Sequence, residues 1–173
     1  LSLCGVEGRV NCADFFSIAP EPIYDIVASY GFIEHFKNFD EVFERHVGFL
    51  KPGGILVLGI PRFRGLNYLI QKLIDFDNSR PLLPSHYLEI MDLKTFREQG
   101  RASNLAMLFC NYVGGFEQAL FPVMTAPPGW RRNLARVLMK LSRHLLGRCN
   151  LAFCASYQIS IFRKPVENQR NES

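Results

Sequence analysis

The stretch that decides the fold is residues 24–61, YDIVASYGFIEHFKNFDEVFERHVGFLKPGGILVLGIP. Asp25–Ser29 is a short apolar run rich in strand-forming residues, and Ile55–Ile60 is a second one, so both indicate buried strands. Between them the apolar positions keep helical spacing, with Asp40 as the expected helix cap. The Lys51–Gly54 segment, which contains proline and glycine, ends this helix. The order strand, helix, strand predicts a βαβ unit with parallel strands and a right-handed crossover.

The loop after the first of these strands carries two adjacent ionisable side chains, Glu34 and His35. A histidine titrates near neutral pH and can therefore act as a general base, while a neighbouring carboxylate can orient its ring. The alternative is that the two residues only cap or brace the helix that follows. The sequence leaves both interpretations open.

A family resemblance follows from the ordered set of motifs in this stretch. The pattern D-I-V-x-S-x-G-x-I-E-H-F, then a helix, then L-K-P-G-G-x-L-V-L resembles the central part of class I S-adenosylmethionine-dependent methyltransferases. Gly8–Phe15 resembles the preceding strand of that fold, which ends in an acidic residue. The resemblance covers residues 5–61 well and the rest loosely. It implies an α/β, Rossmann-like fold with a mostly parallel sheet and an antiparallel final strand.

The resemblance also implies a cofactor, S-adenosyl-L-methionine, at the carboxyl ends of the strands. Asp14 would accept a hydrogen bond from the adenine amine, and Phe15 would form an apolar wall beside the base. Ser29, Tyr30 and Gly31 would lie under the methionine part of the cofactor. The residues alone also allow Asp14 to be a turn or cap residue, and Gly31 to be a glycine that merely permits a bend.

Methyl transfer to a small-molecule acceptor is the activity that the resemblance implies, at an oxygen, nitrogen or carbon atom, with His35 as the general base. Some family members that are similar to the ubiquinone-pathway O-methyltransferases carry E-x-x-E-H in this loop and bind a divalent metal. Here Gly31 stands at the position of the first glutamate, so no metal is expected.

Two further cofactor-binding features of the family have no counterpart in the sequence. These are a glycine-rich loop after the first strand and an acidic residue at the end of the second, because few residues precede the strand expected at Arg9–Ala13. The fold is therefore expected to be truncated at its N-terminus. Were these 173 residues the entire polypeptide, cofactor affinity should be poor. The rival interpretation is a methyltransferase-like module without catalysis that serves in binding.

A single domain is expected over residues 1–164, since 173 residues with 48% apolar side chains can bury one sizeable core. Family members often insert a lid over the acceptor site after the strand that ends at Pro61, and residues 62–90 would be that segment. A surface excursion packed by its own leucines is the alternative. Residues 165–173 are polar and expected to be a disordered tail. The candidate substrate contacts of the lid are Tyr68, His86 and Tyr87.

Later elements follow from the same kind of pattern. A helix is expected at Asn67–Phe76, and another is expected to start at Asp92 and to stop at Gly100. Strands are expected at Leu105–Val113 and Ala152–Phe162. Arg62, directly after the second strand of the βαβ unit, could meet an anionic acceptor, although a solvated arginine is the default.

Residues 130–146 predict an amphipathic basic helix within a region that holds no acidic residue between Glu117 and Glu167. One interpretation is that its apolar side packs on the sheet while its arginines face water. The other is that the helix makes peripheral contact with an anionic membrane. A nucleic-acid partner is not expected, because no set of stacking aromatic residues accompanies the charges. The apolar positions are Leu134, Val137, Leu138, Leu141 and Leu145.

The five cysteines include no C-x-x-C pair, which indicates reduced thiols and a cytoplasmic protein. No apolar run approaches the roughly 18 residues of a membrane-spanning helix. A nicotinamide-dependent dehydrogenase would share the sheet type, but the sequence contains no G-x-G-x-x-G.

Overall fold

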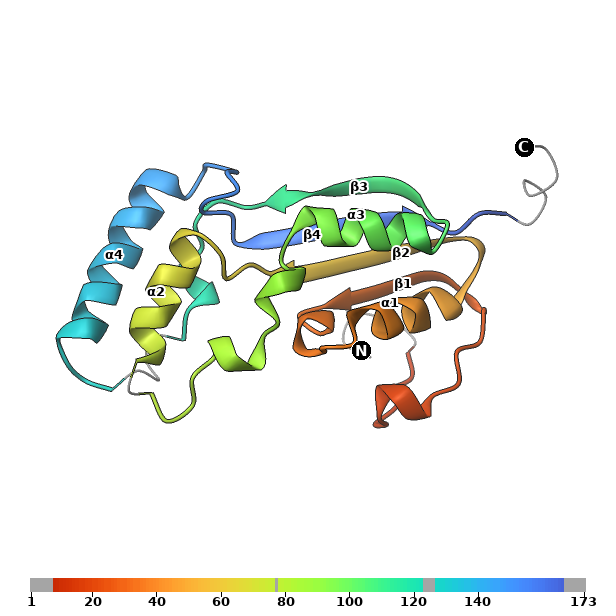
Figure 1. Cartoon of the computed structure of the whole chain (residues 1–173), viewed down its shortest axis with the longest axis horizontal. Coiled ribbons are helices and arrows are strands. Elements are labelled where there is room, and N and C mark those ends of the chain that lie inside the picture. Colours follow the sequence, from red (N-terminus) through yellow and green to blue (C-terminus); the bar gives the residue numbers. More distant parts are fainter. Residues whose placement is uncertain (1–7, 77, 123–126, 167–173) are drawn as a thin grey trace.

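A computed structural model describes residues 8–76, 78–122 and 127–166, and its centre is a four-stranded sheet in the order β1-β2-β4-β3 (Figure 1). β1 and β2 pair in parallel, whereas β4 pairs antiparallel with both β2 and β3. Three strands therefore run in one direction and the last strand runs in the other, which confirms the predicted fold class. The strands are β1 (Tyr24–Tyr30), β2 (Leu50–Pro61), β3 (Ala106–Val113) and β4 (Tyr157–Arg163).

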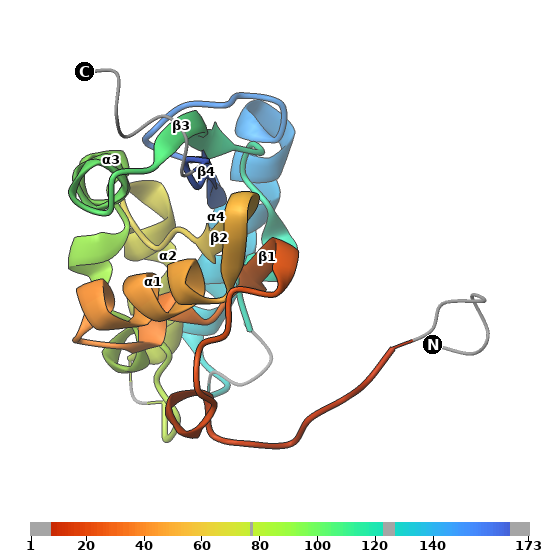
Figure 2. The same ribbon diagram turned by 90° about the vertical axis from the view of Figure 1, so that its right-hand side faces the viewer.

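The helices form two groups around this sheet. α1 and α3 cover one face, as Figure 2 shows in a view along the strands. α2 and α4 lie side by side at one end of the molecule, beyond the carboxyl ends of β1, β2 and β3 (Figure 1). The helices are α1 (Phe39–Gly48), α2 (Leu66–Asp75), α3 (Leu93–Ala102) and α4 (Trp130–Leu146).

The hydrophobic core lies between the sheet and the α1–α3 layer. Alternate residues of β2, namely Leu56, Leu58 and Ile60, are buried on this side, as the two-residue period of a strand requires. Phe162 of β4 is also buried here, and its ring contacts that of Phe43 on α1 at a centroid distance of 5.7 Å. The βαβ unit predicted from residues 24–61 thus supplies most of the centre of the fold.

The strand predicted at Arg9–Ala13 is wrong, because residues 8–13 pair with no other strand in the described part of the chain. Val10, the segment's large apolar residue, is 86% exposed, so the segment has no apolar face to dock beside β1. Local hydrogen bonds favour a turn instead: the Asp14 carboxylate accepts the backbone N–H of Phe16 at 2.7 Å and caps the 3₁₀ turn Phe15–Ser17.

Helix boundaries agree more closely with the sequence. α2 and α4 begin and end within one residue of the predicted positions. Asp92 caps α3 as expected, and its carboxylate accepts the N–H of Lys94 at 2.9 Å. α1 begins at Phe39 after Asn38, so the cap predicted at Asp40 is wrong. α3 continues through Gly100 to Ala102, and the predicted stop at Gly100 is wrong as well.

The buried side of α4 is not the side that its leucines predicted. Ala135, Met139 and Ser142 are buried, and α4 packs against α2 rather than on the sheet. Most of the predicted core positions of α4 are consequently exposed: Leu134, Val137, Leu141 and Leu145.

The remaining predictions concern the cysteines, membrane-spanning helices, the C-terminal tail and the lid. The four cysteines among the described residues are free. None of the helices in this part of the chain combines the length and the apolar character needed to cross a bilayer. Of the tail predicted at 165–173, residues 167–173 lie outside the described residues. The lid predicted at residues 62–90 contains α2 and two 3₁₀ turns, Leu83–Ser85 and Leu88–Ile90, and its role remains a prediction.

Candidate functional site

The carboxyl end of β1 turns sharply at Gly31, whose φ of +62° lies in the left-handed region that favours glycine. The Gly31 N–H donates to the Gly59 carbonyl of β2 at 2.9 Å, which fixes the end of the strand. Ser29 and Tyr30 are the last residues of β1. The Tyr30 ring covers Gly59 on the face of the sheet opposite to α1 and α3. A Cβ at position 31 would lie 3.7 Å from Glu34 Oε1, so the Gly31 backbone borders this carboxylate.

Glu34 presents a buried carboxylate at this edge. It lies in the 3₁₀ turn Ile33–His35, is fully buried, and neither of its oxygens accepts a hydrogen bond from the described residues. Burial raises the pKa of Glu34 above its ordinary value. The backbone N–H of Glu34 and the neighbouring His35, with Nε2 at 3.8 Å from Oε1, act in the opposite direction. A buried carboxylate favours a nearby positive charge or a proton.

Two histidine rings adjoin this carboxylate. His35 donates from Nδ1 to the Ser85 carbonyl at 2.7 Å, and Nδ1 of His86 lies 3.0 Å from the Leu82 carbonyl. Because a carbonyl only accepts, the proton of the neutral His35 ring lies on Nδ1 and its lone pair on Nε2. Nδ1 of His86 also lies 3.0 Å from the Ser85 hydroxyl, which can donate or accept. The ring centroids are 4.4 Å apart. Burial is the main cause that lowers the pKa of His86. The structure thus places His35, the predicted base, next to His86, a predicted substrate contact.

The turn around His86 is tied to the β1 loop by the backbone as well. The Tyr87 N–H donates to the Glu34 carbonyl at 2.8 Å, so the two segments hold each other in place. His86 is therefore fixed beside His35 by bonds that involve residues far apart in the sequence. No spacing rule in the sequence could have revealed this pairing.

Glu34, His35 and His86 form a group whose potential metal-ligand atoms all lie within 4.8 Å of one another. One carboxylate and two imidazoles suit divalent transition metals. The expectation of no metal rested on Gly31 in place of a glutamate, and it did not consider His86 as a third group. Metal independence remains a prediction.

Asp14 and Phe15, the predicted adenine contacts, lie in a different environment. The Asp14 carboxylate caps its own turn, and Phe15 packs against Phe32 and Phe49 at centroid distances of 5.2 and 6.2 Å. Phe15 also lines a cavity of about 300 Å³ together with Tyr24 at the start of β1. Phe32 follows Gly31 directly, so Phe15 contacts the loop at the end of β1, whereas no described contact joins Asp14 to that loop. The adenine role of both residues remains a prediction.

Tyr68, a predicted substrate contact on α2, lines a cavity of about 330 Å³ next to the histidine pair. Phe63 forms part of its wall, and the Phe63 ring contacts His86 at a centroid distance of 5.2 Å. The third predicted contact, Tyr87, is exposed. The remaining lining residues are Arg64, Gly65, Leu88 and Glu89.

Arg62, directly after β2, is buried, so the default of a solvated arginine is wrong. Its guanidinium carbon lies 4.3 Å from the ring centroid of Tyr112 on β3, and Nε and Nη1 have no hydrogen-bond partner among the described residues. This cation–π contact stabilises the buried charge. The position of Arg62 after an apolar strand gave no signal of its burial, which depends on the neighbouring β3 strand.

No protein-family model and no curated protein sequence matches the chain. Several solved structures, however, match the chain. YcgJ from Bacillus subtilis has a TM-score of 0.55 at 16% identity, covering 95% of this chain and 74% of that protein. Phosphoethanolamine N-methyltransferase 2 from Haemonchus contortus, in complex with S-adenosyl-L-methionine, has a TM-score of 0.50 at 16% identity, covering 88% of this chain and 36% of that one.

A SAM-dependent methyltransferase from Archaeoglobus fulgidus matches at a TM-score of 0.48 and 18% identity over 87% of this chain. The chain spans 63% of that protein and 58% of a further matching protein from Galdieria sulphuraria. At identities of 16–18%, similarity to these structures is evidence for the fold alone. The chain has the Rossmann-like fold of the class I S-adenosylmethionine-dependent methyltransferases.

Proposed function

We propose that this chain belongs to an S-adenosylmethionine-dependent methyltransferase that acts on a small-molecule acceptor. The observation that carries the proposal is the carboxyl end of β1, where the Gly31 backbone borders the buried carboxylate of Glu34 and His35 lies beside it. The fold supports it, since one matching protein was solved with this cofactor.

The residues at the end of β1 fit the methionine side of the cofactor. The nearest atom to a Cβ at Gly31 is the Glu34 carboxylate at 3.7 Å, so a ligand can approach the backbone there. S-adenosyl-L-methionine supplies a methyl group on a positively charged sulfur, and a buried carboxylate favours such a charge. Ser29, Tyr30 and Gly31 would hold this side of the molecule. Asp14 and Phe15 are the proposed adenine contacts.

His35 would hold the proton that an oxygen or nitrogen acceptor must lose. Its Nδ1–H is fixed on the Ser85 carbonyl, so the proton would be accepted by the lone pair of Nε2, which lies 3.8 Å from Glu34 Oε1. Methyl transfer is an in-line displacement, so much of the rate depends on how the acceptor is positioned. The cavity of Phe63 and Tyr68 beside His86 is the proposed acceptor site.

Calorimetric titration of the full natural polypeptide with S-adenosylhomocysteine tests the proposal. We compare Gly31→Ala with Gly53→Ala, a matched control, because both glycines have left-handed backbones, with φ of +62° and +80°, but Gly53 lies outside the proposed site. A Cβ at either position costs about 1 kcal/mol in backbone strain. We expect at least fivefold weaker binding for Gly31→Ala and unchanged binding for Gly53→Ala.

The rival function, a methyltransferase-like module without catalysis, makes a different prediction. It predicts no turnover of any offered acceptor, whether or not S-adenosylhomocysteine binds. No heat from S-adenosylhomocysteine with the intact protein would remove the enzyme proposal, and binding without turnover would favour the module.

A further inference from the structure

An apolar stripe runs along the exposed side of α4. Val137 and Leu145 are each 62% exposed, and Leu134 and Leu141 lie on the same side, because positions three or four residues apart share one side of a helix. Trp130, at the start of the helix, is 66% exposed and continues the stripe. Five large apolar side chains thus form one continuous exposed row: Trp130, Leu134, Val137, Leu141 and Leu145.

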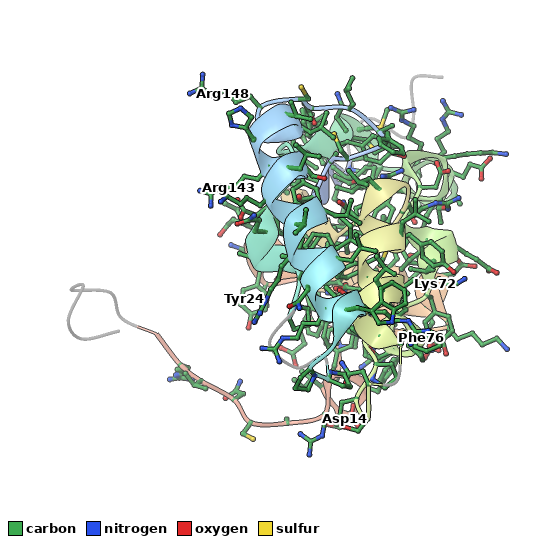
Figure 3. All side chains as sticks on the ribbon, turned by 90° about the vertical axis from the view of Figure 1, so that its left-hand side faces the viewer. Asp14, Tyr24, Lys72, Phe76, Arg143 and Arg148 are labelled. Atoms are coloured by element: carbon green, nitrogen blue, oxygen red, sulfur yellow. The ribbon has the colours of Figure 1, made fainter. Side chains whose placement is uncertain are left out.

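The described residues leave this stripe exposed. α4 packs against α2, and its buried residues, Ala135, Met139 and Ser142, lie on a different side of the helix from the stripe. Figure 3 shows α4 beside α2, with the outer surface of α4 facing the viewer at the end of the molecule. A contiguous apolar row at an exposed helix surface marks an interaction site.

Positive charge borders the stripe on one side. Lys140 and His144 line a shallow cavity together with Val137 and Leu141 of the stripe. Lys140 and His144 also line a larger cavity of about 690 Å³ with Arg143 and Arg148. The sequence contains no acidic residue between Glu117 and Glu167. The surface around α4 is therefore complementary to an anionic partner.

We propose that α4 is an interfacial helix that binds the surface of a bilayer containing anionic lipids. The row of Trp, Leu and Val side chains would enter the boundary between headgroups and acyl chains, and Lys140 and Arg148 would meet the phosphates. A helix of 17 residues has a length of about 25 Å, and it would lie parallel to the surface. A nucleic acid would use the charges but would leave the apolar row in water.

The place of α4 in the fold suits this arrangement. α2 and α4 lie beyond the carboxyl ends of β1, β2 and β3, the same end at which Glu34 and His35 are found (Figure 1). A bilayer on α4 would then lie at this end of the molecule. The inference does not depend on methyl transfer, because it rests on the surface of α4 alone.

Vesicle binding of the full chain tests the proposal. The probes are vesicles of phosphatidylcholine alone and of phosphatidylcholine with about 30% phosphatidylserine. Trp130 is the sequence's single tryptophan, so its fluorescence reports on α4 directly. We expect a blue shift of its emission, at least tenfold tighter binding to the anionic vesicles, and weaker binding as salt is raised.

Two double variants separate the apolar and charged contributions, namely Val137→Gln with Leu141→Gln and Lys140→Glu with Arg148→Glu. We expect each to weaken binding to anionic vesicles at least tenfold. Leu108→Gln on β3 and Arg101→Glu on α3 are matched exposed controls, and both should stay within twofold of the parent. All six substituted positions are exposed, so folding should be retained, and circular dichroism checks this.

Equal binding to both vesicle types, or an unchanged Trp130 spectrum, would overturn the proposal. So would loss of binding in the two control variants to the same degree. Tight binding to a short RNA duplex that depends on Lys140 and Arg148 but not on Val137 and Leu141 would identify a nucleic-acid surface instead.

Discussion

The ring of Phe162 on β4 occupies the space in which a side chain at Gly100 on α3 would lie. A Cβ at position 100 would come within 2.3 Å of Cε1 of this ring. Phe162 is fully buried and is held on its other side by Phe43, so its ring has little room to move. Glycine at position 100 therefore allows α3 to pack closely on the sheet.

Gly100→Ala should destabilise the protein by about 1–3 kcal/mol, because the added methyl group overpacks the core. In an ordinary helix interior the same change would stabilise by about 0.5–1 kcal/mol, so the sign itself is informative. Denaturant unfolding measures the difference. The double variant Gly100→Ala with Phe162→Leu should regain part of the loss, and a raised midpoint for Gly100→Ala would contradict the packing.

His46 should make stability depend on pH. It is buried beside Phe15 and Phe32, its Nδ1–H donates to the Val42 carbonyl at 2.7 Å, and burial lowers the pKa of its ring below the ordinary 6.5. The unfolded chain therefore takes up a proton at this residue before the folded chain does. Its stabilising contribution is fully present above about pH 6.5 and falls as the pH decreases below that value.

His46→Gln should flatten the decline in unfolding free energy between about pH 7 and pH 5, because glutamine can donate a hydrogen bond but does not titrate. His144→Gln is the matched control, since His144 is exposed on α4. Unfolding measured at several pH values checks this. A slope equal to that of the parent in His46→Gln would show that other groups, such as His86, determine the decline.

His35→Gln should lower kcat by roughly 10²–10⁴-fold if His35 removes a proton from the acceptor. Affinity for S-adenosylhomocysteine should stay within threefold, because the proposed role concerns the acceptor. The measurement requires an accepted substrate and compares kcat with calorimetric Kd. A similar loss in both quantities would assign His35 to cofactor binding or to local structure instead.

Removal of metal should leave activity and cofactor binding unchanged, as expected from Gly31 at the position of a ligating glutamate. Dialysis against a chelator, followed by elemental analysis and assay, tests this expectation. The test is informative because Glu34, His35 and His86 place potential metal ligands within 4.8 Å of one another. Loss of activity that returns with Zn²⁺ or Co²⁺, and does not return in His86→Asn, would show that this group binds metal.

Asp14→Ala should weaken S-adenosylhomocysteine binding about fivefold if the carboxylate accepts the adenine amine, since one hydrogen bond contributes about 1 kcal/mol. The cap that Asp14 provides to Phe16 N–H would be lost in the same variant. Thermal unfolding without ligand measures that separate effect. Unchanged affinity with lowered stability would leave only the capping role.

The sequence by itself determined the local elements around the site. Apolar runs and helical spacing predicted β1, α1 and β2, and the structure confirms their order and parallel pairing. The turn predicted at Lys51–Gly54 is wrong, because α1 already ends at Gly48 and these four residues belong to β2. The last strand was also expected to run against the others, and it does. The predicted bounds of α4 hold because helical spacing and a preceding glycine act within a few residues.

The tertiary structure alone decided which surfaces these elements use. Leucine spacing showed that α4 has an apolar side, but in the folded chain Ala135 and Ser142 are buried and most of the leucines are exposed. Backbone contacts between distant loops brought His86 to His35. The reason is physical: residue spacing fixes a local conformation, whereas burial depends on which neighbouring element approaches.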